Sequence, residues 1–352
     1  MRVMPGRNDR GGLIRGCAVL LGIACAGGGA LATPPGERVE IFREQGIHFA
    51  PGDSARFASA EVRPSDGGRL VARTLPLSRP ARPTRITAWA ATRPVPKAPD
   101  EVHDRWDRAG NVRLRLSGGA DIEILRFVTA YGGATLQRAD VSHLAPLLEG
   151  PCTFVGFIDT WTSPAWTMDF GLEYSWFDTT AQWEPALDMA MADWVLPLLY
   201  TDGLTAENQP PEGLAAGVEI PAGTRRVVLV ACTSGHCTDG RGADEFVTKD
   251  HVVAVDGFVV ERFRPWRGDC RRFRELNPYC RRWADGSWSS DYSRSGWCPG
   301  DRVAPLELDL TDHLGPGPHR LSLRVEDIRP RDEEGHFGYW RVSACLVGWH
   351  SR

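Results

Sequence analysis

The sequence predicts an all-β protein built from sandwiches of antiparallel strands. Short segments in which apolar and polar residues alternate recur along the chain, as expected of strands with one buried face. Glycine and proline, 38 and 26 of the 352 residues, separate these segments and interrupt regular elements. No long stretch has the period of an amphipathic helix. A sandwich or jelly roll is therefore favoured over a βαβ fold.

Individual segments support this fold class in chain order. Residues 112–116 alternate apolar and charged side chains, which predicts a half-buried strand. Residues 252–255 and 258–260 flank the pair Asp256-Gly257. Because Asp-Gly tolerates the positive φ angles of a tight turn, we expect these two runs to form a hairpin.

The C-terminal part continues the pattern. Residues 306–310 and 320–325 alternate in the same way, and residues 314–318 form a Gly/Pro break between them. The one helical signal is weak, a short turn expected within residues 141–148.

The chain is long enough for two domains, since a domain has about 150 residues. The patterning weakens around residues 177–181, which we take as the connection between them. The expected organisation is a leader at 1–32, an N-terminal domain at 36–177 and a C-terminal domain at 183–352.

The leader has the composition of a secretion signal. Four arginines between residues 2 and 15 precede an apolar run at 17–25, and small residues ending at Ala32 suit cleavage there. The apolar run is shorter than the ~20 residues of a membrane span. We therefore expect a secreted or periplasmic protein with no stable membrane association. A buried N-terminal helix and lipid anchoring at Cys25 remain as alternatives.

Charge and cysteine content narrow the classes of function. The net charge of −4 shows no basic excess of the kind that binds nucleic acid. Cysteine usage suits an oxidising compartment, and an odd number after cleavage leaves at least one thiol unpaired. The seven cysteines beyond the leader are Cys152, Cys232, Cys237, Cys270, Cys280, Cys298 and Cys345.

Three short segments place an acid beside an aromatic ring, at 106–108, 159–161 and 244–246. Carboxylates supply general acid and base chemistry, and flat rings can cover the C–H faces of a sugar. Together with the Trp/Cys/Gly-rich stretch around Trp297, they indicate a carbohydrate-handling site assembled from distant parts of the chain.

The order and spacing of these segments resemble the bacterial peptide-N-glycosidase F family of glycoamidases. The most specific stretches are 106–112, 126–129, 159–161 and 294–300. The resemblance implies two antiparallel jelly-roll domains of the eight-stranded sandwich type, packed side by side with the site between them. It also implies metal- and cofactor-free hydrolysis of the amide between N-acetylglucosamine and asparagine. The expected substrates are N-glycosylated proteins or glycopeptides, and the expected state is a monomer.

The resemblance assigns catalytic roles to three acids. Asp107 matches the principal acid, expected to hold or deprotonate water while Arg108 keeps it ionised. Glu245 matches a second essential acid. Neighbours in an extended segment point to opposite faces, so Asp244 is expected to be solvated. Asp159 stands where the family has Glu; its carboxylate would sit about 1 Å back, a displacement that can cost about 100-fold in rate.

Side chains around these acids are expected to bind substrate. The tryptophans would form apolar walls, while His236 and Arg294 would hydrogen-bond the sugar. Ser234 and Phe246 stand where the family shows Trp, which bears on substrate preference more than on reaction type. The expected binding residues are Trp106, Arg108, Trp161, His236, Phe246, Arg294 and Trp297.

The resemblance also implies a disulfide between Cys270 and Cys298. Closing that loop of 28 residues would stabilise the fold by on the order of 3–4 kcal/mol in the chain-entropy model. It would also fix the loop that carries Arg294. Two other family cystines are missing, since His103 and Ala243 stand where cysteines are expected.

Other chemistries remain open at this point. Cys232 and Cys237 could clamp the loop of His236, or bind zinc together with His236 and His251, although the spacing of these four residues is not a standard structural zinc set. Copper is disfavoured because no His-His or His-x-His pair occurs. The main alternative function is a non-catalytic secreted glycan-binding protein. A glycosidase is a further one, since two carboxyl groups also suffice there.

Overall fold

The computed structural model describes residues 36–53, 58–80, 84–176, 191–239 and 243–350. The predicted leader and the predicted connection near residues 177–181 lie outside these ranges. Every named pair of neighbouring strands is antiparallel, for example β1 with β11 and β14 with β20. The predicted all-β fold is confirmed. No helix among the described residues has the length and apolarity to cross a membrane.

Two sheets form the first sandwich. One has the order β1-β11-β4-β9 and the other β17-β8-β7-β10-β3-β2. Apolar side chains of both sheets, Phe42, Phe154 and Phe170 among them, form one buried cluster. The strands are β1 (Arg38–Ile47), β2 (Val62–Ser65), β3 (Leu70–Leu77), β4 (Arg85–Pro94), β7 (Ala109–Arg115), β8 (Asp121–Val128), β9 (Thr135–Asp140), β10 (Gly150–Ile158), β11 (Trp166–Ser175) and β17 (Arg302–Val303).

Two further sheets form the second sandwich, with the orders β12-β20-β14-β18 and β13-β19-β15-β16. Its own buried cluster includes Leu229, Val253 and Trp340. The strands are β12 (Trp194–Leu204), β13 (Leu214–Ile220), β14 (Thr224–Cys237), β15 (His251–Val255), β16 (Phe258–Phe263), β18 (Leu306–Asp309), β19 (Gly317–Val325) and β20 (Gly338–His350).

Short elements connect the strands. The predicted helical turn is a 3-10 helix, Ser142–Leu147. In the predicted hairpin, Asp256 and Gly257 adopt φ angles of 51° and 86°, as a tight turn between β15 and β16 requires. The remaining elements are β5 (Pro96–Ala98), β6 (Glu101–Val102), α1 (Ala243–Phe246) and the 3-10 helices Asp66–Gly68, Cys270–Leu276 and Ser289–Asp291.

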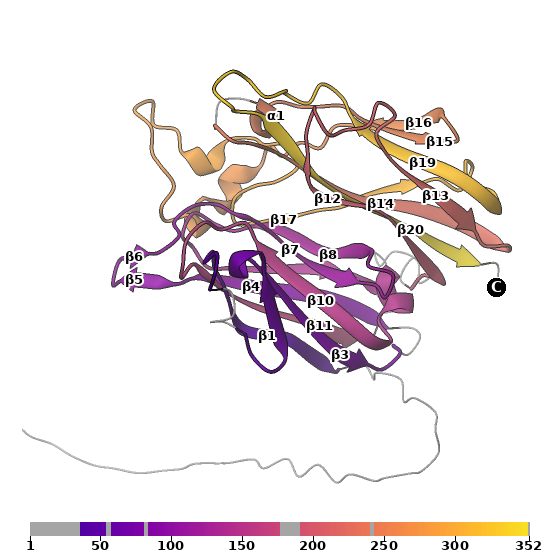
Figure 1. The fold of residues 1–352 in the computed structure, drawn as a ribbon, viewed down its shortest axis with the longest axis horizontal. Helices are drawn as coiled ribbons and strands as arrows, with labels where there is room; N and C mark the ends of the chain where they lie inside the picture. The colour runs from indigo at the N-terminus through magenta and orange to yellow at the C-terminus, as the bar shows by residue number, and fades with distance from the viewer. Residues whose placement is uncertain (1–35, 54–57, 81–83, 177–190, 240–242, 351–352) are drawn as a thin grey trace, which may run out of the picture. The chain divides into compact units, whose positions relative to one another are not determined.

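The two sandwiches lie against each other, as Figure 1 shows for the indigo-to-magenta and orange-to-yellow strands. Strand β17 comes late in the chain yet pairs with β8 of the first sandwich, which the sequence patterns did not predict. Buried Arg126 of β8 donates to the carbonyl oxygen of Arg341 in β20 at 2.7 Å, and Ser343 donates to Glu123 at 2.6 Å. Polar groups therefore join the two halves.

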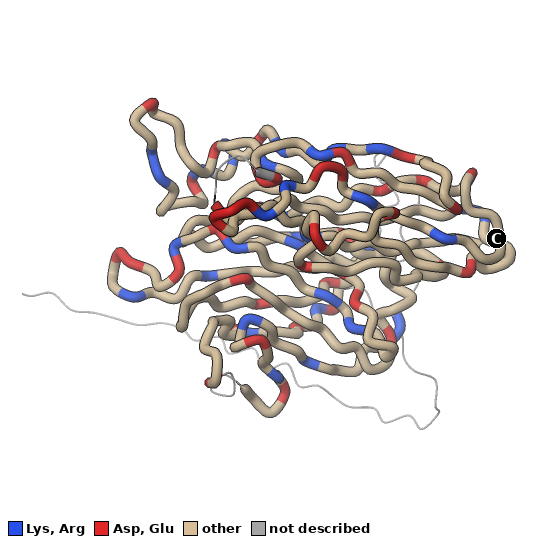
Figure 2. Tube along the Cα trace, turned by 45° about the horizontal axis from the view of Figure 1, so that its top comes forward, with Lys and Arg blue, Asp and Glu red and all other residues tan. Residues whose placement is uncertain are grey.

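Charge is distributed without a single basic face. Figure 2 shows Lys and Arg positions interspersed with Asp and Glu over the described chain. Many of these charges are paired across strands, such as Arg138 with Glu173 and Arg262 with Glu326. Such exposed pairs contribute little stability, about 0–1 kcal/mol each.

Candidate active site between the two sandwiches

The first sandwich brings its site residues to one edge of its six-stranded sheet. Strand β7 runs antiparallel to β8 and β10, so the start of β7 lies beside the ends of its two neighbours. Asp107 precedes β7, Tyr131 follows β8 and Asp159 follows β10. Three side chains that are distant in sequence thus meet at one edge.

The second sandwich supplies its residues from the end of β14. His236 lies on β14, and Glu245 follows on α1, which is helical rather than extended as expected from the sequence. Asp244 is completely buried, which corrects the expectation that it is solvated. It accepts a hydrogen bond from the backbone of Arg329 at 2.9 Å and packs on Gly338, where any side chain would collide with it.

Arg294 joins the two predicted catalytic acids. Its guanidinium is 1% exposed; Nε donates to Oε1 of Glu245 at 3.2 Å, and Nη2 lies 4.0 Å from Oδ2 of Asp107. The carbonyl oxygens of Tyr292 and Ser289 each accept a hydrogen bond from it at 2.9 Å. The structure therefore places Asp107 and Glu245 around one fixed cation.

Tyr131 completes this group, and neither the motifs nor the resemblance pointed to it. Its hydroxyl donates to Asp107 and accepts from Nη2 of Arg294 at 3.5 Å. Burial, followed by the charge of Asp107, raises the pKa of Tyr131, so its proton stays in place. Its backbone N–H donates to Asn277 at 2.8 Å, which fixes the turn.

Burial sets the protonation of both acids. Burial, opposed by Arg294 and reinforced by the charge of Asp107, raises the pKa of Glu245 from 4.5 to about 7. Burial also raises the pKa of Asp107, although Arg294 and Tyr131 counter it. Two carboxyl groups that share one cation do not ionise independently. With a pKa of about 7, Glu245 can hold a proton near neutral pH.

Arg108 does not pair with Asp107 as expected. Its guanidinium donates two hydrogen bonds to buried Asp104, at 2.9 and 3.0 Å. Asp104 also accepts from Thr160 at 2.6 Å and Trp166 at 3.2 Å. Burial opposes its ionisation, but the hydrogen bonds and charge of Arg108 prevail and lower the pKa of Asp104. This network holds the turn that carries Asp107, whose main cation is Arg294.

Asp159 is held by two arginines. Arg341, from β20, donates to Oδ2 at 2.6 Å, and Arg69 donates to Oδ1 at 3.1 Å. Arg69 also lies 4.5 Å from the ring centre of Trp161. A carboxylate fixed in this way is suited to binding and orienting a substrate.

The aromatic residues divide into buried and exposed groups. The His236 ring stacks between Trp297 and Tyr339, with centroids 5.3 Å away on each side. Burial, helped by nearby arginines, lowers the pKa of His236 well below its usual value, so the ring is neutral. Trp297 is 3% exposed, whereas Trp106 and Trp161 are 52% and 59% exposed. Of these three tryptophans, Trp106 and Trp161 are the exposed ones.

Two hollows meet at the carboxylates and share Asp107, Arg108, Cys237, Thr238 and Glu245. We call the larger one, of about 1110 Å³, the ring hollow; its aromatic lining is Trp106, Tyr131, Phe246, Trp266, Tyr279, Trp283 and Tyr292. We call the other, of about 880 Å³, the polar hollow; its charged and amide lining includes Asp159, Asp202, Glu207, Asn208, Arg331 and Arg341, beside Trp161.

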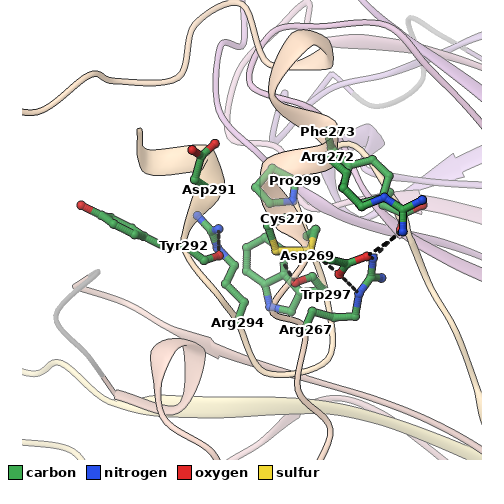
Figure 3. The surroundings of a disulfide bond; sticks show 12 residues. Arg267, Asp269, Cys270, Arg272, Phe273, Asp291, Tyr292, Arg294, Trp297 and Pro299 are labelled. Carbon is green, nitrogen blue, oxygen red and sulfur yellow. Dashed lines mark hydrogen bonds and ion pairs between the residues drawn. A yellow bond between two sulfur atoms is a disulfide. The ribbon is translucent and has the colours of Figure 1, made fainter. Parts of the chain in front are cut away.

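The predicted disulfide between Cys270 and Cys298 is present, with a Cα–Cα distance of 5.1 Å. Figure 3 shows it beside Trp297, in the loop that also carries Arg294. Phe246 lies near the same loop, with its ring 5.1 Å below the guanidinium of Arg294. The bond therefore encloses the segment that positions the shared cation.

The structure tests the two alternatives suggested for Cys232 and Cys237, a disulfide clamp and a zinc site. Cys232 and Cys237 are not joined by a disulfide, so the suggested clamp is wrong. The Cys237 thiol instead donates to Oε2 of Glu245 at 3.4 Å. Cys232, His236, Cys237 and His251 do not form a group with ligand atoms within 4.8 Å among the described residues. His251 packs between the rings of Phe263 and Trp340.

Known proteins are similar to this chain in sequence and in fold. Residues 207–347 match the family described as peptide-N-glycosidase F, C terminal, which confirms the resemblance seen in the sequence. No curated protein matches the chain by sequence.

Solved structures share the fold. PNGF-II superposes with a TM-score of 0.76 at 21% identity, over 90% of this chain and 65% of that one. A peptide-N(4)-(N-acetyl-beta-D-glucosaminyl) asparagine amidase gives a TM-score of 0.66 at 18% identity, over 90% and 97% of the two chains. PNGase F, a glycosylasparaginase from Flavobacterium meningosepticum, gives 0.64 at 19% identity, with the same coverage. This chain thus spans less than two thirds of the length of PNGF-II.

Proposed function

We propose that this chain is a glycoamidase, supported by the match of residues 207–347 to the peptide-N-glycosidase F family model and by the shared fold. It would hydrolyse the amide bond between N-acetylglucosamine and the asparagine side chain of N-glycoproteins or glycopeptides. The observation that carries the proposal is the convergence of Asp107 and Glu245 on Arg294, where the two hollows meet.

Each acid has a distinct role in this reaction. Asp107 accepts a proton from water, whose oxygen attacks the amide carbon of the asparagine side chain. Protonated Glu245 hydrogen-bonds the amide and donates its proton to the nitrogen when the C–N bond breaks. The asparagine becomes aspartate, and the glycan leaves as a glycosylamine. Asp107 therefore gains one proton and Glu245 loses one, so the number of protons is conserved.

Arg294 and Tyr131 support these steps. The guanidinium fixes both carboxylates and stabilises negative charge as the carbonyl oxygen becomes an oxyanion. Tyr131 holds Asp107 in position through its hydroxyl. Because the residues supply acid, base and charge, we propose that no metal is required, and we expect activity to survive a chelator.

The test is incubation of the mature chain with a denatured N-glycoprotein and with a short glycopeptide, followed by mass spectrometry. Release of the glycan with conversion of Asn to Asp supports the glycoamidase. Binding without conversion would identify a glycan-binding protein, and cleavage between sugars would identify a glycosidase.

Asp107→Asn gives the matched control. We expect it to abolish turnover while glycan affinity and the fold remain, because the amide keeps the size of the side chain but cannot accept the proton. If this variant keeps most of its activity, the role of Asp107 is wrong.

We also propose that the protein is exported, with cleavage after Ala32, and that it acts as a monomer. The basic and apolar pattern of residues 1–32 motivates the first proposal. N-terminal sequencing of the protein from a native host tests it, since a mature chain that starts elsewhere would contradict it. Sedimentation of the purified chain tests the second.

A further inference from the structure

We propose that the ring hollow binds the polypeptide around the glycosylated asparagine and favours acidic side chains there. This inference rests on the proposed function, because it needs the reacting amide to lie at Asp107 and Glu245. A glycosylated asparagine extends in two directions from that amide, toward the sugar and toward the polypeptide. Two hollows meet at the same two carboxyl groups. One hollow can therefore hold the sugar and the other the polypeptide.

The lining of the polar hollow is suited to binding the sugar. Asp159, Asp202 and Arg341 form a linked set, with Arg341 donating to both carboxylates at 2.6 and 2.8 Å. Such fixed charged groups suit the closely spaced hydroxyls of a sugar. Trp161, which is 59% exposed, adds an aromatic ring, and Arg69 lies 4.5 Å from the centre of that ring.

The ring hollow differs because its cations stack on rings. Arg105 lies 5.5 Å from the ring centre of Trp106, and Arg281 lies 3.9 Å from that of Trp283. Trp106 is 52% exposed, Trp283 is 37% exposed, and both arginines are exposed. An arginine stacked on a ring keeps the N–H groups at its edge for a carboxylate partner.

These two arginines carry uncompensated charge. No ion pair among the described residues involves Arg105 or Arg281, whereas other cations of the hollow are committed. Arg108 bonds to Asp104, and Arg294 bonds to Glu245. Of the acids that line the hollow, Asp239 is paired with Arg329 at 2.9 Å. The rim is therefore positive, and a negatively charged peptide complements it.

The segment that carries Arg281 is well ordered by its own contacts. The backbone N–H of Trp283 donates to the carbonyl oxygen of Ser287 at 2.9 Å, and Ser289 donates back to Arg281 at 2.8 Å. The Ser287 and Tyr292 hydroxyls lie 3.0 Å apart. The same disulfide-closed segment carries Arg294. Arg281, which lines the ring hollow, and Arg294, which contacts both acids, thus belong to one loop.

The test compares kcat/KM for two series of glycopeptides with the full mature chain. In the first series one neutral glycan is attached to peptides that differ only in having Asp or Lys beside the asparagine. In the second series one peptide carries the glycan with or without terminal carboxylate sugars. The variants are Arg281→Gln and Arg105→Gln. The matched control is Arg282→Gln, which changes the same charge on the same hairpin but does not line the hollow.

We expect the wild type to prefer the Asp peptides. Arg281→Gln and Arg105→Gln should each lower kcat/KM for these peptides by about two- to five-fold, the range of an exposed ion pair. The Lys peptides and the Arg282→Gln variant should change little. Added salt should reduce the preference, because exposed charges are screened.

Three results would overturn the inference. A loss that follows the carboxylate sugars of the second series would assign the ring hollow to the glycan. Turnover without any dependence on peptide charge would remove the peptide assignment while leaving the glycoamidase intact. Absence of glycan release by the wild type in both series would instead overturn the proposed function, and the peptide assignment with it.

Discussion

Arg294 donates from Nε to Oε1 of Glu245 at 3.2 Å while its guanidinium is almost completely buried. The same guanidinium reaches Asp107 at 4.0 Å, so one cation faces two carboxyl groups from different sandwiches. Burial outweighs this cation and raises the pKa of both carboxyl groups, that of Glu245 to about 7, so that Glu245 can carry a proton at neutral pH. The proposed chemistry needs this state, because it uses one base and one acid at the same time.

The first prediction concerns pH. The pKa of Glu245 is raised to about 7, so loss of its proton should lower kcat/KM as the pH rises through about 7. The pKa of Asp107 is raised above 3.8, so protonation of the base should lower kcat/KM again at acidic pH. A bell-shaped profile of kcat/KM measures both groups in the free enzyme. A rate that keeps rising above pH 8 would contradict the role of Glu245.

The same shift predicts a stability effect with a defined sign. The folded chain binds the Glu245 proton more tightly than the unfolded chain, whose pKa is near 4.5. Stability should therefore fall as the pH rises from about 4.5 through about 7. Glu245→Gln removes this penalty, so its melting temperature should exceed that of the wild type at pH 8 and approach it at pH 4.5. Equal melting temperatures at pH 8 would mean that the shift is absent.

The second prediction concerns Tyr131. Tyr131→Phe removes a hydrogen bond to Asp107, and bonds to charged groups are worth about 1.5–3 kcal/mol. We expect kcat to fall about ten-fold or more, with little change in KM and an intact fold. Tyr174→Phe is the control, because it deletes a buried hydroxyl away from the site. Equal effects of the two substitutions would make Tyr131 a structural residue only.

Local patterns predicted the strands because each strand has one buried and one wetter face. The β15–β16 hairpin was predictable from Asp256-Gly257, since those residues accept positive φ angles. The resemblance pointed to Asp107, Glu245 and Arg294, which the fold brings together. Their roles remain proposals, but the positions were accessible from short motifs in the correct order.

The hydrogen-bond partners of the site residues could not be predicted from short motifs. Arg69 and Arg341 bind Asp159 from 90 and 182 residues away, and no local pattern marks an arginine for such a contact. Arg108 was expected to pair with its neighbour Asp107, yet it donates to Asp104, four residues earlier in the chain. Burial and long-range pairing depend on the packing of two sandwiches, which alternation does not encode.

The third prediction concerns Asp159, which stands where the family has Glu. In Asp159→Glu the added methylene brings the carboxylate about 1 Å closer to the sugar, and a shift of that size can change the rate by about 100-fold. We expect Asp159→Glu to raise kcat/KM. Asp159→Asn, which removes the negative charge, should lower kcat/KM. Asp202→Glu is the matched control, because Asp202 shares Arg341 as a partner at 2.8 Å. A lower rate in Asp159→Glu would show that the aspartate is fitted to its two arginines.

The fourth prediction concerns the Cys270–Cys298 disulfide. Cys270→Ser opens a loop of 28 residues, which in the chain-entropy model costs on the order of 3–4 kcal/mol of stability. The loop also carries Arg294 and Asn277, whose side chain accepts from the backbone of Tyr131 at 2.8 Å. We therefore expect a lower melting temperature and a lower kcat, measured by calorimetry and by glycan release.

Cys280→Ser controls for the loss of a sulfur from the same segment, since Cys280 is not in a disulfide. It should leave both quantities nearly unchanged. If Cys270→Ser lowers the melting temperature but not kcat at a temperature where the variant is folded, the bond stabilises the domain without positioning Arg294. If neither quantity changes, the contacts of Asn277 and Arg294 hold the loop without the covalent link, because those hydrogen bonds persist in the serine variant.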